Sequence, residues 1–345
     1  MRPTFRRGPR FVLNCVIPVP GFMTQPRPSR VLIVLSFAAV YLVWGSTYLG
    51  IRYAIETLPP FLMAGTRFSL AGAILFSWAL INRESIRSSF SQWPKALAIG
   101  GLLLLGGNGG VTWAEKYIPS GFAALLVATE PFMVVVLNWG LSHKRPNSKV
   151  LLGVFIGLVG VALLVSDGLR GGIGTSPRNL LSVAVVLFAS FAWAAGSVFA
   201  NRRPIKTSTS MAAGMQMLGG GSLLLLLALA AGDFPRLNLA AASWVSIGAF
   251  FYLLVFGSLV GFTAYSWLLR NVSTARAATY AYVNPVVAVL LGWFLASEPL
   301  NVRMLIAAAI IIASVALITT YGQDHTTTAA PNSVHDSECP TPPCA

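Results

Sequence analysis

One apolar stretch constrains this chain more than any other. It runs from Ser120 to Ser142, and an acid followed by a proline, Glu130-Pro131, stands near its centre. About 20 apolar residues form a helix of about 30 Å, enough to cross the hydrocarbon core of a bilayer. A carboxylate in the middle of such a helix is costly, so it normally faces a cavity or a polar partner rather than lipid. Since proline removes a backbone hydrogen bond, the stretch predicts a membrane helix bent at Pro131 with an acid at the bend.

The same pattern returns in the stretch from Thr274 to Leu295, where Asn284-Pro285 takes the place of the acid and the proline. An alanine pair, the proline and a tryptophan recur there at one fixed offset from the first stretch. We therefore expect Pro285 to bend its helix as Pro131 does. Two such helices in corresponding halves of a chain are typical of a transporter site.

The composition is that of an integral membrane protein. The chain has 345 residues, of which 55% are hydrophobic and only 10% charged, whereas a soluble domain carries about 25% charge. The net charge of +14 is spread over the segments between apolar runs rather than gathered on one face, which argues against nucleic acid as a partner. Cys15, Cys339 and Cys344 lie outside the apolar runs without a CxxC spacing, so we expect free thiols, no metal site and no cofactor.

The pattern predicts an all-α chain of about ten transmembrane helices. Residues 1–30 read as a disordered basic cytosolic arm, in which translation starts at Met1 or Met23, and residues 322–345 as a disordered cytosolic tail. The predicted spans are 31–52, 60–82, 95–115, 120–142, 149–166, 179–201, 209–231, 243–269, 275–297 and 302–321.

Loop charge predicts the orientation. If the chain begins in the cytosol, 17 of its 24 lysines and arginines fall in cytosolic segments, six fall outside, and Arg67 lies within a helix. This bias predicts a multi-pass protein of the inner cell membrane with both termini in the cytoplasm.

An internal repeat divides the chain into residues 31–168 and 179–321. Trp113 with Trp267 and Gly107 with Gly261 share the offset of the two proline-containing stretches. Each half holds five predicted helices, an odd number, so the second half should insert upside down relative to the first. Such an inverted repeat is a frequent plan of secondary transporters, with the site where the repeats meet.

Three runs carry a resemblance to a known family: VYLVWGSTYLGIRYAIETLPP from Val40 to Pro60, FLMAGTRFSLAGAIL from Phe61 to Leu75, and GGNGGVTWAEKYIPSGFAALLVATEPF from Gly106 to Phe132. With its two five-helix repeats, the chain resembles the EamA-like branch of the drug/metabolite transporter superfamily. The resemblance implies ten helices, cytosolic termini, a central cavity, and transport of small metabolites, often export of amino acids or other solutes. Many relatives carry an uncharged residue where this chain has Glu130.

Arg67 and Glu130 are the charged residues that lie well inside the predicted spans. Counted from the outer helix ends, their depths differ by only about 4 Å, within reach of an ion pair. Such a pair predicts a charged site for a zwitterionic substrate or a proton-linked gate. The alternative is an ion pair that only fixes helix packing.

Further candidates for substrate binding or gating are polar and aromatic residues inside the spans. Trp44 and Thr47 share one helix face, Tyr280 and Asn284 share another, and Asn108 stands in the glycine run Gly106–Gly110. They could line a cavity, or they could pack between helices with their polar groups satisfied. The glycine run favours close helix packing over a hinge.

These patterns predict a secondary transporter for a small metabolite, an amino acid or a related solute, that works by alternating access. Proton coupling and the oligomeric state stay open. One alternative is a passive channel or facilitator. A membrane-embedded enzyme is the weaker alternative, because the three histidines, His143, His325 and His335, lie in loops or the tail and no HExxH motif is present.

Overall fold

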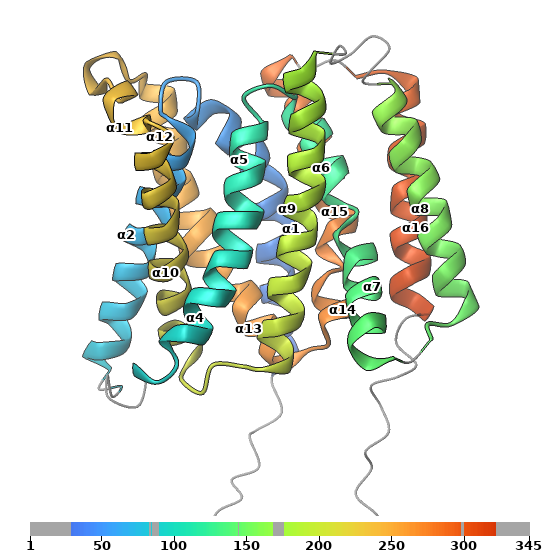
Figure 1. Cartoon of the computed structure of the whole chain (residues 1–345), viewed down its shortest axis with the longest axis horizontal. Coiled ribbons are helices and arrows are strands. Elements are labelled where there is room, and N and C mark those ends of the chain that lie inside the picture. Colours follow the sequence, from blue (N-terminus) through green and yellow to red (C-terminus); the bar gives the residue numbers. More distant parts are fainter. Residues whose placement is uncertain are drawn as a thin grey trace, which may run out of the picture.

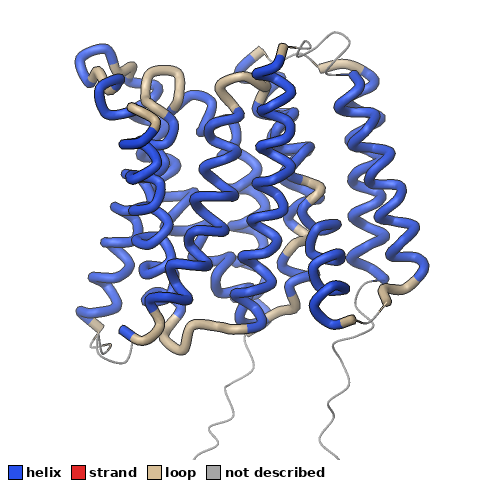
Figure 2. The backbone as a smooth tube through the Cα atoms, viewed as in Figure 1, coloured by secondary structure: helices blue, strands red, loops and turns tan. Residues whose placement is uncertain are grey.

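The computed structural model describes residues 29–82, 84, 90–143, 145–167, 176–297 and 300–321. Within these ranges the backbone is helical with short connections and no strand (Figure 2). The predicted tail, nearly all of the predicted arm, the three cysteines and both candidate start methionines lie outside the described residues. The all-α prediction is confirmed for the part of the chain that is described.

The helical elements follow the predicted spans, and their outer ends lie within three residues of the predicted ones. Elements η1 and η4 are π-helical, and η3 is a 3-10 turn. In chain order the elements are α1 (Arg30–Ala54), α2 (Pro60–Ile81), α4 (Trp93–Gly100), η1 (Gly101–Gly109), α5 (Gly110–Ala114), α6 (Ser120–Val127), α7 (Glu130–Ser142), α8 (Ser148–Asp167), α9 (Pro177–Arg202), α10 (Thr209–Ala230), α11 (Asp233–Arg236), η3 (Leu239–Ala241), α12 (Trp244–Tyr252), η4 (Leu253–Phe262), α13 (Thr263–Asn271), α14 (Thr274–Ala277), α15 (Tyr280–Ala296) and α16 (Val302–Tyr321).

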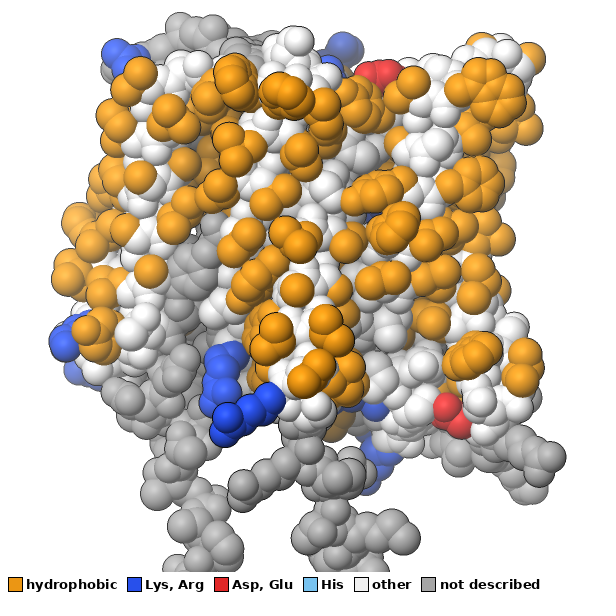
Figure 3. Space-filling view, turned by 180° about the vertical axis from the view of Figure 1, so that it is seen from behind, with side chains coloured by type: hydrophobic (Ala, Val, Ile, Leu, Met, Phe, Trp, Pro, Cys, Tyr) orange, Lys and Arg blue, Asp and Glu red, His pale blue; other side chains and the backbone are white. Residues whose placement is uncertain are grey.

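Seven helical segments among the described residues are long and apolar enough to cross a membrane. They are Arg30–Ala54, Pro60–Ile81, Trp93–Ala114, Ser120–Ser142, Pro177–Arg202, Thr209–Ala230 and Trp244–Asn271. Three shorter apolar helices accompany them: Ser148–Gly160, Val283–Ala296 and Val302–Ile318. Hydrophobic side chains cover one face over most of its height, and lysines and arginines lie towards its two ends (Figure 3). This distribution suits a lipid-facing surface between two aqueous layers.

The helices form a bundle with a tightly packed pair at each edge (Figure 1). Helices α2 and α10 make one pair, α8 and α16 the other, and α1, α9 and α15 lie between them. Helix α1 begins and α16 ends at the same end of the bundle.

Glycines bring the backbones of α2 and α10 into contact. A Cβ atom on Gly72 would lie 2.7 Å from the backbone nitrogen of Leu218, and one on Gly221 would lie 2.7 Å from that of Ser69. Real Cβ atoms do not approach a backbone atom that closely, so any larger residue here would push the two helices apart.

Two kinds of interruption break the helices near the centre of the bundle. The π-helical segments η1 and η4 occupy nearly corresponding positions in the two halves. Between α6 and α7 the chain breaks at Ala128 and Thr129, and α7 begins at Glu130, next to Pro131, which has no N–H to continue the helix. The second proline behaves differently: Pro285 lies inside α15, and the break falls at Ala278 and Thr279 instead.

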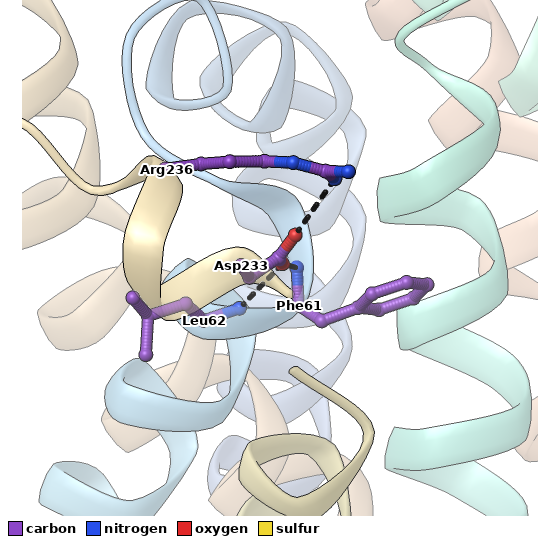
Figure 4. Close-up of polar contacts among 4 residues, drawn as sticks. All are labelled: Phe61, Leu62, Asp233 and Arg236. Carbon is purple, nitrogen blue, oxygen red and sulfur yellow. Dashed lines mark hydrogen bonds and ion pairs between the residues drawn. The ribbon is translucent and has the colours of Figure 1, made fainter. Parts of the chain in front are cut away.

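Asp233 ties a connecting segment to the start of α2 (Figure 4). Its Oδ2 accepts hydrogen bonds from the backbone N–H groups of Phe61 at 3.0 Å and Leu62 at 3.3 Å, and its Oδ1 lies 3.8 Å from Nη1 of Arg236. The first N–H groups of a helix lack partners within the helix. Since the N-terminus of a helix favours negative charge, Asp233 caps α2 from 171 or more residues away.

Candidate functional site

A pocket lies where α1, α2, η1, α5, α6, α9, η4 and α15 meet, with about 670 Å³ of space that no atom fills, its opening included. Six residues that the sequence singled out line it: Trp44, Thr47, Arg67, Asn108, Tyr280 and Asn284. Aromatic and small side chains complete the wall, among them Tyr48, Phe68, Gly107, Trp193, Gly257 and Phe262. The pocket is therefore largely apolar, with a few polar groups that converge on it, as is usual for small-molecule sites.

Arg67 supplies the charge on the pocket wall. Its side chain is 2% exposed, and Nη2 donates a hydrogen bond of 2.8 Å to Oδ1 of Asn108. Thr112 donates to the same oxygen at 3.3 Å, so Asn108 is held in place from two sides. The Nε atom of Arg67 has no hydrogen-bond partner among the described residues. One donor of the buried guanidinium is therefore left without an acceptor in this structure.

The carboxylate that acts electrostatically on Arg67 is Glu115, which is fully buried at the end of α5. Arg52, at the end of α1, donates a hydrogen bond of 2.8 Å to the backbone oxygen of Glu115. Glu115 is the last residue of the predicted span 95–115 and is not among the residues that the sequence pattern selects.

Glu130 has a different partner. It is fully buried at the start of α7, and Tyr280 of α15 donates a hydrogen bond of 2.6 Å to its Oε2. Its Oε1 has no hydrogen-bond partner among the described residues. Glu130 does not line the pocket itself, but Tyr280 does, so the phenol links the pocket to the carboxylate.

Arg67 and Glu130 therefore do not form the ion pair that the sequence suggests. Their depths along the helices are similar, but depth does not fix the direction in which a side chain points. Arg67 points towards Asn108 and Glu130 towards Tyr280.

Four aromatic rings form a cluster at the inner wall of the pocket. Trp44 contacts Trp193, Tyr265 and Tyr280, with centroid distances of 5.4, 4.9 and 5.3 Å. Tyr265 also contacts Tyr280 at 5.7 Å and shares a hydrogen bond of 2.7 Å with Ser197. Edge-on and tilted contacts of this kind stabilise aromatic pairs beyond the area that they bury.

Two glycines of the π-helical segments make room for the tryptophans. A Cβ atom on Gly261 of η4 would lie in hard contact with the indole nitrogen of Trp44, and one on Gly107 of η1 would lie 2.7 Å from Cε3 of Trp193. Trp44 comes from the first half of the chain and contacts η4 in the second, whereas Trp193 comes from the second half and contacts η1 in the first. The sequence pairs these two glycines as repeat matches but does not reveal what they contact.

The remaining candidates are held by local bonds. Thr47 donates a hydrogen bond of 2.7 Å to the backbone oxygen of Trp44. In the amide orientation that satisfies its neighbours, Asn284 donates to the backbone oxygens of Tyr41 at 3.0 Å and Tyr280 at 3.3 Å. Its nitrogen thus joins α1 to α15, and its Oδ1 remains an acceptor. Pro131 and Pro285 do not line the pocket.

Several residues of the site escape the sequence argument. Trp193 carries a signal that could have found it, since it stands mid-span like Trp44 rather than near a helix end. Tyr265 and Ser197 carry no comparable signal, because single hydroxyls are common in membrane helices. Within the described part of the chain, no group of three or more His, Cys, Asp or Glu side chains could hold a metal ion.

Comparison with known proteins identifies the family. Residues 31–166 and 180–320 match the family described as the EamA-like transporter family. The "Uncharacterized inner membrane transporter YedA" of Escherichia coli strain K12 is 37% identical over 284 residues, which cover 81% of this chain and 88% of YedA. The "Probable amino-acid metabolite efflux pump" of Salmonella typhimurium strain LT2 is 27% identical over 286 residues, which cover 79% of this chain and 90% of that pump.

A solved crystal structure of another protein has a similar fold. It superposes with a TM-score of 0.62 at 21% identity and covers 84% of this chain and 98% of its own. The two family matches together extend over most of the described helices, and YedA is similar over nearly its whole length. The chain is therefore a membrane transporter that belongs to the EamA-like transporter family.

Proposed function

We propose that this chain is a secondary transporter that exports a small metabolite, an amino acid or a related solute, across the inner cell membrane by alternating access. The observation that carries the proposal is the pocket. Its walls come from α1, α2, η1, α5 and α6 of the first family match and from α9, η4 and α15 of the second. A site lined by both halves can open to either side when one group of packed helices rocks against another. The name of the Salmonella relative, "Probable amino-acid metabolite efflux pump", supports this solute class and direction.

The architecture that goes with this function is ten passes in two inverted five-helix repeats, 31–168 and 179–321, with both termini in the cytoplasm. Three observations support it: α1 begins and α16 ends at one end of the bundle (Figure 1), the π-helical segments nearly correspond, and each half packs a tryptophan against a glycine of the other.

Within the site, Arg67 and Asn108 would bind a polar group of the substrate, and Trp44, Thr47, Tyr280 and Asn284 would complete the contacts. Glu130 would either hold a charge of the substrate or exchange a proton that is coupled to transport. A bend next to Pro131, at the break between α6 and α7, would let Glu130 move relative to the pocket.

Counterflow in proteoliposomes tests the proposal. Vesicles are loaded with unlabelled amino acids, and entry of a labelled one is compared with entry into empty vesicles. A carrier shows faster entry into loaded vesicles, whereas equal entry would indicate a channel and contradict the proposal. Arg67→Gln should abolish the exchange, and Arg236→Gln, which alters an exposed arginine, should not.

A further inference from the structure

The buried charges of the described residues do not balance at Glu130. In the described part of the chain, four charged side chains are buried: Arg67, Glu115, Glu130 and Asp233. Asp233 accepts two backbone hydrogen bonds and lies beside Arg236. Glu115 is the carboxylate that acts on Arg67. Glu130 is left with one neutral hydrogen bond, from Tyr280.

The groups that face Glu130 are phenols rather than cations. Its charge acts on Tyr48 of α1, Tyr265 of α13 and Tyr280 of α15. No lysine or arginine among the described residues is paired with it, and Oε1 is buried without a hydrogen-bond partner. A buried carboxylate in such surroundings requires a counter-charge or a proton.

The pocket side of this carboxylate suits a cation. Tyr280 donates its hydroxyl proton to Glu130, which leaves the phenol oxygen as an acceptor that is polarised by the carboxylate. Asn284 lies one turn further along the same face of α15, lines the pocket, and has Oδ1 as an acceptor. The ring of Trp44 contacts Tyr280, and the faces of such rings attract cations.

We propose that Glu130 and Tyr280 form a recognition site for a protonated amine, so that the transported solute carries an ammonium group. This inference rests on the proposed transport function for the role of the pocket. It makes no demand on the rest of the solute, which is either an amine or an amino acid.

Three probes of one shape distinguish these solutes. Phenethylammonium carries only the cation, phenylalanine carries the cation and a carboxylate, and 3-phenylpropionate carries only the carboxylate. Binding of each to the purified full-length protein is measured by thermal shift, since a ligand of the native state raises its apparent stability. We expect at least one of the two ammonium compounds to bind more tightly than 3-phenylpropionate. If phenethylammonium binds as well as phenylalanine, the solute is an amine, and if only phenylalanine binds, it is an amino acid.

Variants locate the site. Glu130→Gln keeps the shape of the side chain but removes the negative charge behind Tyr280, so it should weaken binding of the ammonium compound by about tenfold to a hundredfold. Tyr280→Phe keeps the aromatic ring and should weaken binding of the ammonium compound less than Glu130→Gln does. Glu56→Gln, which alters an exposed acid outside the pocket, should leave it unchanged.

Two results would overturn the inference: equal affinity of Glu130→Gln and the native protein for the ammonium compounds, or binding that is absent or tightest for 3-phenylpropionate. Counterflow of phenylalanine that does not depend on Glu130 would leave the proposed transport function standing while this inference fails. Ammonium binding that depends on Glu130, without exchange of any amine or amino acid, would support this inference and contradict the proposed transport function.

Discussion

The indole nitrogen of Trp44 donates a hydrogen bond of 3.1 Å to the backbone oxygen of Gly257, so the first helix of the chain is bonded to a π-helical segment 213 residues away. A π-helix leaves carbonyl groups that its own turns do not fully use, and such segments often occur at functional sites. The bond holds Trp44 against Gly261 at the wall of the pocket.

Gly261→Ala should therefore displace Trp44 and reduce transport strongly. The added methyl group would overlap the indole nitrogen, and the ring has Trp193, Tyr265 and Tyr280 on its other sides. Gly248→Ala in α12 is the matched control, because nothing lies within 4 Å of its new methyl group and it should raise helix stability by about 0.5–1 kcal/mol. Counterflow rates and melting temperatures of both variants check this, and normal transport by Gly261→Ala would contradict it.

Gly107→Ala should have the reciprocal effect on Trp193. Its methyl group would lie 2.7 Å from Cε3 of that ring. We expect slower transport without loss of membrane insertion, since the backbone of η1 can stay helical with alanine. The double variant Gly107→Ala, Trp193→Phe should recover part of the rate because the smaller ring can move. If the double variant is no faster than Gly107→Ala alone, contact with the indole is not the cause.

Removal of the cap on α2 should lower stability rather than change substrate binding. Asp233→Ala leaves the N–H groups of Phe61 and Leu62 without their acceptor and should cost about 1–2 kcal/mol. Arg236→Ala should cost less than about 1 kcal/mol. The side chain of Arg236 is 66% exposed, and its Nη1 comes no closer than 3.8 Å to Oδ1 of Asp233. Thermal unfolding in detergent measures both, and equal losses would show that the helix cap is unimportant.

Transport should depend on pH through Glu130. A proton on Glu130 removes the negative charge that attracts the ammonium group through Tyr280, so ammonium binding should strengthen as rising pH deprotonates Glu130. Glu130→Gln should flatten this dependence, and Glu56→Gln should retain it. Ammonium affinity is measured as a function of pH for each protein. The same pH dependence in the native protein and Glu130→Gln would exclude Glu130 as the titrating group.

The proposed orientation can be measured with single cysteines. In a protein whose three native cysteines are replaced by serine, Asn238→Cys should react with an impermeant maleimide in intact cells, because it follows α11 in a predicted outer segment. Thr207→Cys, between α9 and α10, should react only after the cells are opened. Labelling of both positions in intact cells would refute the inverted arrangement.

The sequence predicts the helices of this chain well, because a bilayer imposes a narrow range of lengths on apolar segments. It also selects six residues of the pocket wall, because polar groups inside such segments need partners or a cavity. Which groups pair with each other is harder to predict. Arg67 binds Asn108 and Glu130 binds Tyr280, and both choices depend on helix rotation, which hydrophobicity defines poorly in a bundle that is apolar on all sides.

Residues near segment ends are the other gap in the sequence argument. Glu115 follows α5 at the end of a predicted span, yet it is fully buried and acts electrostatically on Arg67. Pro285 marks its helix in the sequence, but it lies inside α15 and the break lies earlier, at Ala278 and Thr279.

The glycine contacts between α2 and α10 have a consequence for the transport cycle. Backbones that touch at Gly72 and Gly221 join a helix of the first half to a helix of the second, so we expect α2 and α10 to move together as one body in the proposed transport cycle. Arg67 belongs to that body, whereas Glu130 and Tyr280 belong to α7 and α15 outside it. In the proposed cycle the separation between the buried guanidinium and the buried carboxylate should then change as the pocket opens to one side or the other, and a pair of spin labels on α2 and α7 would follow it.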